Sequence, residues 1–208
     1  MTTTWTHLLA RPLVRPLVGT GVTPNHLTTA RLITGLLAAA ALVPGDSGWR
    51  WWAGWLWLLS AFLDRADGEL ARVGNMATLK GRLWDDAVDK TVATAFFFAM
   101  GIGLRHSALG GWAIALGLIA GSSVLLATLS CESLERGQNF AINSYSRVFG
   151  FDPDDLFYLL APGAWLGWLT PILIGSAIVG TALALLTGWR VRRLARRHPG
   201  SATETFSI

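Results

Sequence analysis

Long apolar runs separated by short polar stretches make up most of this chain. A helix needs about 20 mainly apolar residues to cross the hydrocarbon core of a bilayer. By that measure the pattern predicts six membrane-spanning helices, of which the fifth is short and is interrupted by Pro162 and Gly163. The predicted spans cover residues 26–43, 49–70, 83–104, 109–131, 154–169 and 171–189.

The two ends of the chain differ from these spans. Residues 5–19 alternate apolar residues with Arg11 and Arg15 and contain two prolines, so the segment is too short and too charged to span. We expect an amphipathic helix lying in the membrane interface, with a disordered tail as the alternative. Residues 199–208 are polar and are expected to be disordered. No linker of biased composition divides residues 1–198, which predicts a single membrane domain.

Composition supports this class of fold. Hydrophobic residues make up 52% of the chain and charged residues only 14%, whereas a soluble domain carries about a quarter. Many of the 11 tryptophans stand near the ends of apolar runs, where amphipathic rings favour the membrane interface. The single cysteine, Cys131, excludes an internal disulfide framework. The prediction is therefore an all-α, polytopic membrane protein.

The basic residues predict its orientation. The net charge of +4 does not point to nucleic acid, because five arginines cluster just after the last apolar run, where membrane helices carry cytoplasmic charge. With a cytoplasmic N-terminus and six spans, the outer loops contain only Arg50 and Arg105 of the 17 basic residues. The chain is thus expected in a bacterial-type inner (plasma) membrane, with both termini in the cytoplasm. The clustered arginines are Arg190, Arg192, Arg193, Arg196 and Arg197.

Four aspartates interrupt the predicted second and third spans near their cytoplasmic ends. Asp64 and Asp67 are three residues apart, and Asp85 and Asp89 are four apart, so each pair lies on one face of its helix. Acids at membrane depth are costly and usually functional. Because a short loop joins the two spans, we expect adjacent antiparallel helices whose carboxylates converge on a cation.

Oxygen-only ligands favour hard cations, so the acids predict Mg²⁺ or Mn²⁺, possibly two ions, rather than Zn²⁺. Such ions bind phosphate oxygens, which points to a diphosphate substrate. Helix capping and ion pairing would be the ordinary explanation for any one of these acids, but not for four at this spacing with small residues between them.

The string from Asp64 to Asp89 fits the pattern D-x2-D-G-x2-A-R-x8-G-x3-D-x3-D at every fixed position. In this motif, in the six-helix layout and in the amphipathic segment before the first span, the chain resembles the CDP-alcohol phosphotransferases, also called CDP-alcohol phosphatidyltransferases. The resemblance implies an enzyme that joins a CDP-linked donor to an alcohol acceptor through a phosphodiester and releases CMP. It also implies a homodimer.

By position, the resemblance implies roles for individual residues. Asp89 is expected to be the general base that takes the proton of the acceptor hydroxyl. The expected metal ligands are Asp64, Asp67, Asp85 and Asp89. The residues expected to bind the nucleotide are Asn25, Thr28, Asp67, Gly68, Ala71, Arg72, Gly81 and Asp85.

The substrates are less defined by the sequence. The preferred expectation is transfer of a phosphatidyl group from CDP-diacylglycerol to an inositol-, glycerol-phosphate- or serine-type alcohol. A phosphorylated acceptor needs basic residues to bind its phosphate. The polar loop 132–151, which precedes Asp154, could form a lid over the site or simply connect two helices. The candidate acceptor-binding residues are Arg31, Arg136, Arg147 and Asp154.

Two alternatives remain open at this stage. A soluble CDP-alcohol could donate its phosphoalcohol to a lipid acceptor such as diacylglycerol or ceramide. In a different class, buried acids also form cation paths in small transporters. A transporter would be expected to place acids nearer the midplane and to show paired halves, and the sequence shows no internal repeat.

Overall fold

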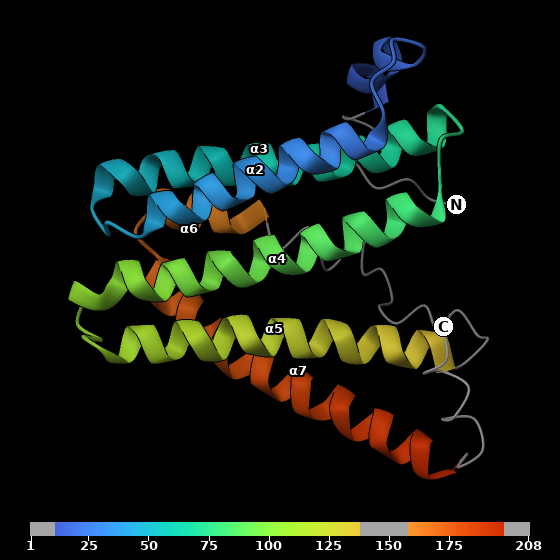
Figure 1. Ribbon diagram of the computed structural model, residues 1–208. Helices are drawn as coiled ribbons and strands as arrows, with labels where there is room; N and C mark the ends of the chain where they lie inside the picture. The colour runs from blue at the N-terminus through green and yellow to red at the C-terminus, as the bar shows by residue number, and fades with distance from the viewer. Residues whose placement is uncertain (1–10, 138–157, 198–208) are drawn as a thin grey trace.

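The computed structural model describes residues 11–137 and 158–197, and over these residues all regular structure is helical (Figure 1). The all-α prediction is confirmed for this part of the chain. Two short 3₁₀ helices, η1 (Arg15–Leu17) and η2 (Leu104–His106), accompany the α-helices. The α-helices are α2 (Pro24–Leu42), α3 (Ser47–Val73), α4 (Leu79–Gly103), α5 (Trp112–Gly137), α6 (Leu160–Trp165) and α7 (Leu169–Arg197).

Local sequence signals explain where several helices begin. Pro24 stands at the first position of α2, where its missing N–H costs nothing. The Asp46 side chain accepts a hydrogen bond from the Trp49 N–H at 2.9 Å and so caps α3. Thr78 caps α4 in the same way, accepting from the Gly81 N–H at 3.0 Å. These caps lie within a few residues of the boundaries that the hydrophobic pattern predicts.

Within the described residues, three stretches are long and apolar enough to cross a membrane, and they support a membrane protein: Leu79–His106, Trp112–Ser130 and Leu169–Arg193. Helices α2 and α3 fall outside this group by their length and composition. The predicted count of six spans therefore stays a prediction.

The predicted fifth span, 154–169, is the one that differs most from the observed helices. Residues 154–157 lie outside the described part of the chain, and the described part holds only the six-residue helix α6. Figure 1 shows α5 and α7 running in the same direction. The interruption at Pro162 and Gly163 falls inside α6.

Helix α2 lies between α3 and α4, which corrects the expectation that these two helices pack directly against each other. Helix α2 packs extensively against both, whereas the backbones of α3 and α4 come close at few points. The approach is close at Gly35, where an added Cβ would lie 2.5 Å from Val92 Cγ1 of α4 and 2.9 Å from Ser60 Oγ of α3. Small residues on α2 thus allow a third helix to fit between the two that carry the aspartates.

One hydrophobic core joins residues of these three helices to residues of α5, α6 and α7. Phe96 of α4 is fully buried, and its ring centroid lies 4.0 Å from that of Trp57 of α3. Helices α4 and α5 cross closely at Gly101 and Gly117, where a Cβ on either would meet the backbone of the other helix. Helix α7 packs against α5 and extends the bundle away from α2 and α3 (Figure 1).

The segment before α2 docks on the end of α3 that carries the acids. Residues 11–17 are helical, and Val14, which is 1% exposed, packs with Ala66 and Leu70. Arg11 pairs with Glu69 at 3.6 Å, while Leu13 is exposed. This amphipathic character agrees with the predicted interfacial helix over 5–19. Residues 5–10 of that prediction, and the tail 199–208, lie outside the described residues.

Candidate active site

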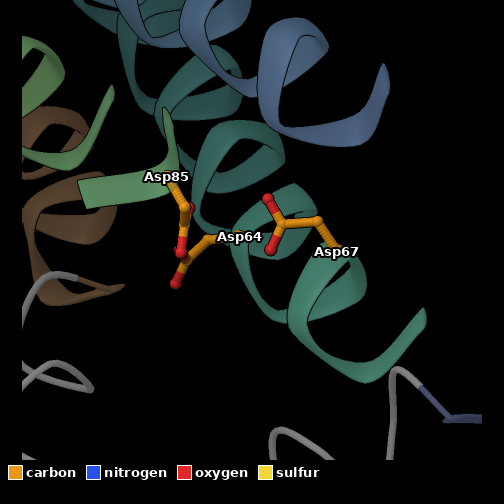
Figure 2. A group of neighbouring side chains, drawn as sticks. All are labelled: Asp64, Asp67 and Asp85. Carbon is orange, nitrogen blue, oxygen red and sulfur yellow. The ribbon is translucent and has the colours of Figure 1, made fainter. Parts of the chain in front are cut away.

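The four motif aspartates meet at one end of the bundle. Asp64 and Asp67 lie in the second half of α3, and Asp85 and Asp89 lie in the first half of α4. Each of Asp64, Asp67 and Asp85 offers a carboxylate oxygen, and these three oxygens lie within 4.8 Å of one another (Figure 2). The spacing in the sequence therefore brings three acids together in space, although α2 separates much of the two helices.

Arg31 of α2 links the fourth acid, Asp89, to two of the other three. Its Nη1 lies 2.7 Å from Asp64 Oδ1 and 3.1 Å from Asp85 Oδ1, and its Nη2 pairs with Asp89. The residue is only 8% exposed. Buried charges require close partners of opposite sign, so Arg31 and these acids stabilise one another.

Helix α2 supplies a second polar contact to the group. The Thr28 hydroxyl donates a hydrogen bond of 2.7 Å to Asp67 Oδ2, and both residues are buried. The Ser60 hydroxyl of α3 donates to the Arg31 carbonyl oxygen at 3.1 Å, which ties α2 to α3 beside the acids. Both contacts restrict the orientation of the site residues before any ligand binds.

The donor set fits a hard divalent cation. Three carboxylate oxygens that converge within 4.8 Å match the oxygen ligands that Mg²⁺ and Mn²⁺ prefer, and no sulfur or imidazole stands among them. Asp64, Asp67 and Asp85 could thus hold a metal ion. Asp89 is not part of this converging group and contacts it through Arg31.

A cavity of about 480 Å³ adjoins Asp67 and Asp85. Gly68 faces open space, because the nearest atom to an added Cβ would be Arg72 Nη2 at 4.0 Å. Arg72 is held by Glu69 at 3.3 Å and by the Gly68 carbonyl oxygen at 3.2 Å. All eight residues predicted to bind the nucleotide line this cavity: Asn25, Thr28, Asp67, Gly68, Ala71, Arg72, Gly81 and Asp85.

A second cavity, of about 190 Å³, adjoins the other two aspartates and Arg31. It extends toward α5 and has a mixed lining, with hydroxyl, basic and apolar groups. The Tyr158 hydroxyl donates to the Ala61 carbonyl oxygen at 2.8 Å, and Lys90 pairs with Glu132 of α5. The lining consists of Arg31, Trp57, Ser60, Ala61, Asp64, Arg65, Asp89, Lys90, Val92, Ala93, Val124, Thr128 and Tyr158.

The predicted acceptor-binding residues have different outcomes. Arg31 lines the second cavity, although its contacts are with the aspartates. Arg136 belongs to α5 by its backbone, but its side chain lies outside the description, as do Arg147 and Asp154. Arg136, Arg147 and Asp154 therefore stay predictions.

Sequence reasoning missed several residues of the second cavity. Ser60, Thr128 and Tyr158 come from three segments far apart in the chain, and none belongs to a recognisable motif. Arg31 was found only as a possible acceptor ligand. The signal that would have placed it among the acids is the small-residue face of α2, which allows that helix to enter between α3 and α4.

Comparison with known proteins agrees with this geometry. No curated protein matches the chain. A protein-family model described as CDP-alcohol phosphatidyltransferase matches residues 21–148, a range that contains the whole aspartate motif, Thr28 and Arg31. Because this match covers more than half of the chain, the chain belongs to the CDP-alcohol phosphatidyltransferase family.

Proposed function

We propose that the protein transfers a phosphatidyl group from CDP-diacylglycerol to a polar alcohol and releases CMP, in a reaction that depends on Mg²⁺ or Mn²⁺. The observation that carries this proposal is that two cavities share one group of aspartates. Asp67 and Asp85 line the larger cavity, and Asp64 and Asp89 line the smaller one. Such an arrangement suits a reaction between two substrates at a common centre.

The larger cavity suits the CDP moiety of the donor. Gly68 leaves its wall open to a flat ligand, and Arg72 offers a guanidinium for a phosphate or base. The adjoining acids, Asp67 and Asp85, are proposed to hold a divalent ion against the diphosphate. When bound, such an ion neutralises charge on the phosphates and improves CMP as a leaving group.

The smaller cavity suits the acceptor. Asp89 lines it and is proposed to take the proton from the acceptor hydroxyl. The hydroxyl oxygen attacks the phosphorus that carries the diacylglycerol. A new P–O bond forms, the P–O bond to the bridging oxygen of the diphosphate breaks, and CMP leaves with that oxygen. Arg31 pairs with Asp89 and holds its carboxylate at the wall of this cavity.

The acceptor class is proposed to be a small polar alcohol of the inositol, glycerol phosphate or serine type. The hydroxyls of Ser60, Thr128 and Tyr158 and the ammonium of Lys90 give the smaller cavity groups that can bind such a molecule.

Arg72, Lys80 and Arg82 flank the end of α3 and the start of α4 that carry the aspartates. This supports a cytoplasmic active site in a bacterial-type inner membrane, and the protein is proposed to work as a homodimer.

A donor comparison tests the proposal. Purified protein in detergent with lipid is given Mn²⁺, a mixture of polar alcohols, and either CDP-diacylglycerol or a soluble CDP-alcohol with diacylglycerol, and released CMP is measured. We expect CMP only with CDP-diacylglycerol. Release with the soluble donor alone would replace the proposal with the reversed arrangement of substrates. Absence of CMP with every donor, together with cation flux in vesicles, would favour a transporter.

A further inference from the structure

Arg31 occupies a position among the aspartates that a bound cation would also require. Its Nη1 lies between Asp64 Oδ1 and Asp85 Oδ1, at 2.7 Å and 3.1 Å. These are two of the three acids whose oxygens converge. One nitrogen thus contacts two of the carboxylates that are proposed to hold the metal.

The two nitrogens of the guanidinium have different partners. Nη1 contacts Asp64 and Asp85, whereas Nη2 contacts Asp89, which stands outside the converging group. The Arg31 backbone is fixed by the Ser60 hydroxyl, but the guanidinium stands at the end of a flexible side chain. It can therefore move away from Asp64 and Asp85 while α2 stays in place.

We propose that Arg31 is an internal counter-cation of the aspartate group, and that a divalent ion displaces its Nη1 from Asp64 and Asp85 while Nη2 keeps its contact with Asp89. This inference rests on the metal-dependent function proposed above. The physical reason is competition: neighbouring carboxylates repel one another unless a cation lies among them, and the metal and the guanidinium would bind the same two carboxylates.

Two consequences follow for a protein that lacks this arginine. Removing Arg31 takes away the competitor, so the divalent ion should bind more tightly. It also leaves the acids without their internal cation, so the protein should be less stable in chelator and should gain more stability from the metal. A residue that merely helped to bind the acceptor would change neither metal affinity nor metal-linked stability.

The experiment compares wild type with Arg31→Gln, without donor or acceptor. Mn²⁺ binding is measured by electron paramagnetic resonance of the free ion, and thermal unfolding is followed in chelator and in Mn²⁺. We expect the Mn²⁺ dissociation constant of Arg31→Gln to fall by about ten-fold or more, because a full charge in contact with the ligands is removed. We also expect a lower unfolding temperature in chelator and a larger rise on adding Mn²⁺.

Arg72→Gln is the matched control for long-range charge. Arg72 lies at the end of α3 that carries Asp64 and Asp67, but it pairs with Glu69. Its replacement by Gln removes one positive charge, as Arg31→Gln does, without freeing Asp64 or Asp85. If Arg31→Gln is too unstable to purify in chelator, Arg31→Lys decides the matter. The single ammonium of lysine cannot bridge three carboxylates, so the Arg31→Lys protein should also bind Mn²⁺ more tightly than wild type.

Unchanged or weaker Mn²⁺ binding by the Arg31 variants would overturn the inference, as would an increase no larger than that of Arg72→Gln. These results would leave the proposed transferase function intact, provided that wild type binds Mn²⁺ and releases CMP. If wild type itself binds no divalent ion, the metal-dependent function fails, and the role assigned to Arg31 fails with it.

Discussion

Asp89 differs from the other motif aspartates in its surroundings. Its carboxylate stands outside the group formed by the other three, and it lines the smaller cavity, whereas Asp67 and Asp85 line the larger one. Asp89→Asn removes a proton acceptor but keeps the size of the side chain. We expect kcat to fall by roughly 10²–10⁴-fold, the usual contribution of a general base, while binding of CDP-diacylglycerol is retained.

Steady-state kinetics and equilibrium binding of labelled donor distinguish these two effects. The matched variant is Asp67→Asn. Asp67 lines the larger cavity, which is proposed to bind the donor, so this variant should lose both turnover and donor binding. An equal loss of donor binding by Asp89→Asn would argue that Asp89 is a metal ligand instead of a base.

The fold has room for a side chain at Gly68, so we expect the glycine to be needed for ligand binding and not for packing. An added Cβ would meet no atom closer than 4.0 Å, so Gly68→Ala should fold at least as stably as wild type, with a gain of up to about 1 kcal/mol from helix propensity. The methyl group would project into the donor cavity, and KM for the donor should rise. Thermal unfolding and donor kinetics on the same preparation test this, and a destabilised variant would contradict it.

At the scale of single residues, the sequence predicted acids that the structure brings together and eight residues that line the larger cavity, while their roles in binding stay predictions. The reason is physical: helical spacing fixes which face each residue occupies, and the motif places acids and small residues on that face. The roles of Arg31 and Ser60 could not be derived in this way, because they depend on which helix lies between α3 and α4.

At the scale of the helices, the position of α2 is the feature that organises the site. By entering between α3 and α4 it brings Thr28 to Asp67 and Arg31 to the other three aspartates. The close contacts of Gly35 with Val92 and Ser60 make this arrangement possible. The short loop between α3 and α4 suggested direct packing of the two helices, since neighbours in sequence are usually neighbours in space.

Gly35→Ala tests the packing of α2. The added methyl group would overlap the stiff side chain of Val92, and overpacking of this kind costs about 1–3 kcal/mol. The control is Gly175→Ala in α7, where an added Cβ meets no atom within 4 Å. We expect a lower unfolding temperature in detergent for the first variant only. Equal unfolding temperatures would show that α2 does not pack as closely as described.

At the scale of the whole molecule, the hydrophobic pattern predicted helices α2 to α5 and α7 to within a few residues at most ends. It extended the fifth span over 154–169, where the described residues hold only the short helix α6. Periodicity and length identify long apolar helices well, but they do not determine how a segment broken by Pro162 and Gly163 folds against its neighbours. Such a segment depends on tertiary contacts, here between α6 and α3.

The most direct test of the whole account measures both products of one reaction. Wild-type protein receives CDP-diacylglycerol and a mixture of polar alcohols, in Mn²⁺ or in chelator, and CMP and lipid products are quantified together. The account predicts one phosphodiester lipid for each CMP in Mn²⁺, and neither product in chelator. Formation of CMP with phosphatidic acid as the only lipid product, or equal turnover in chelator, would contradict it.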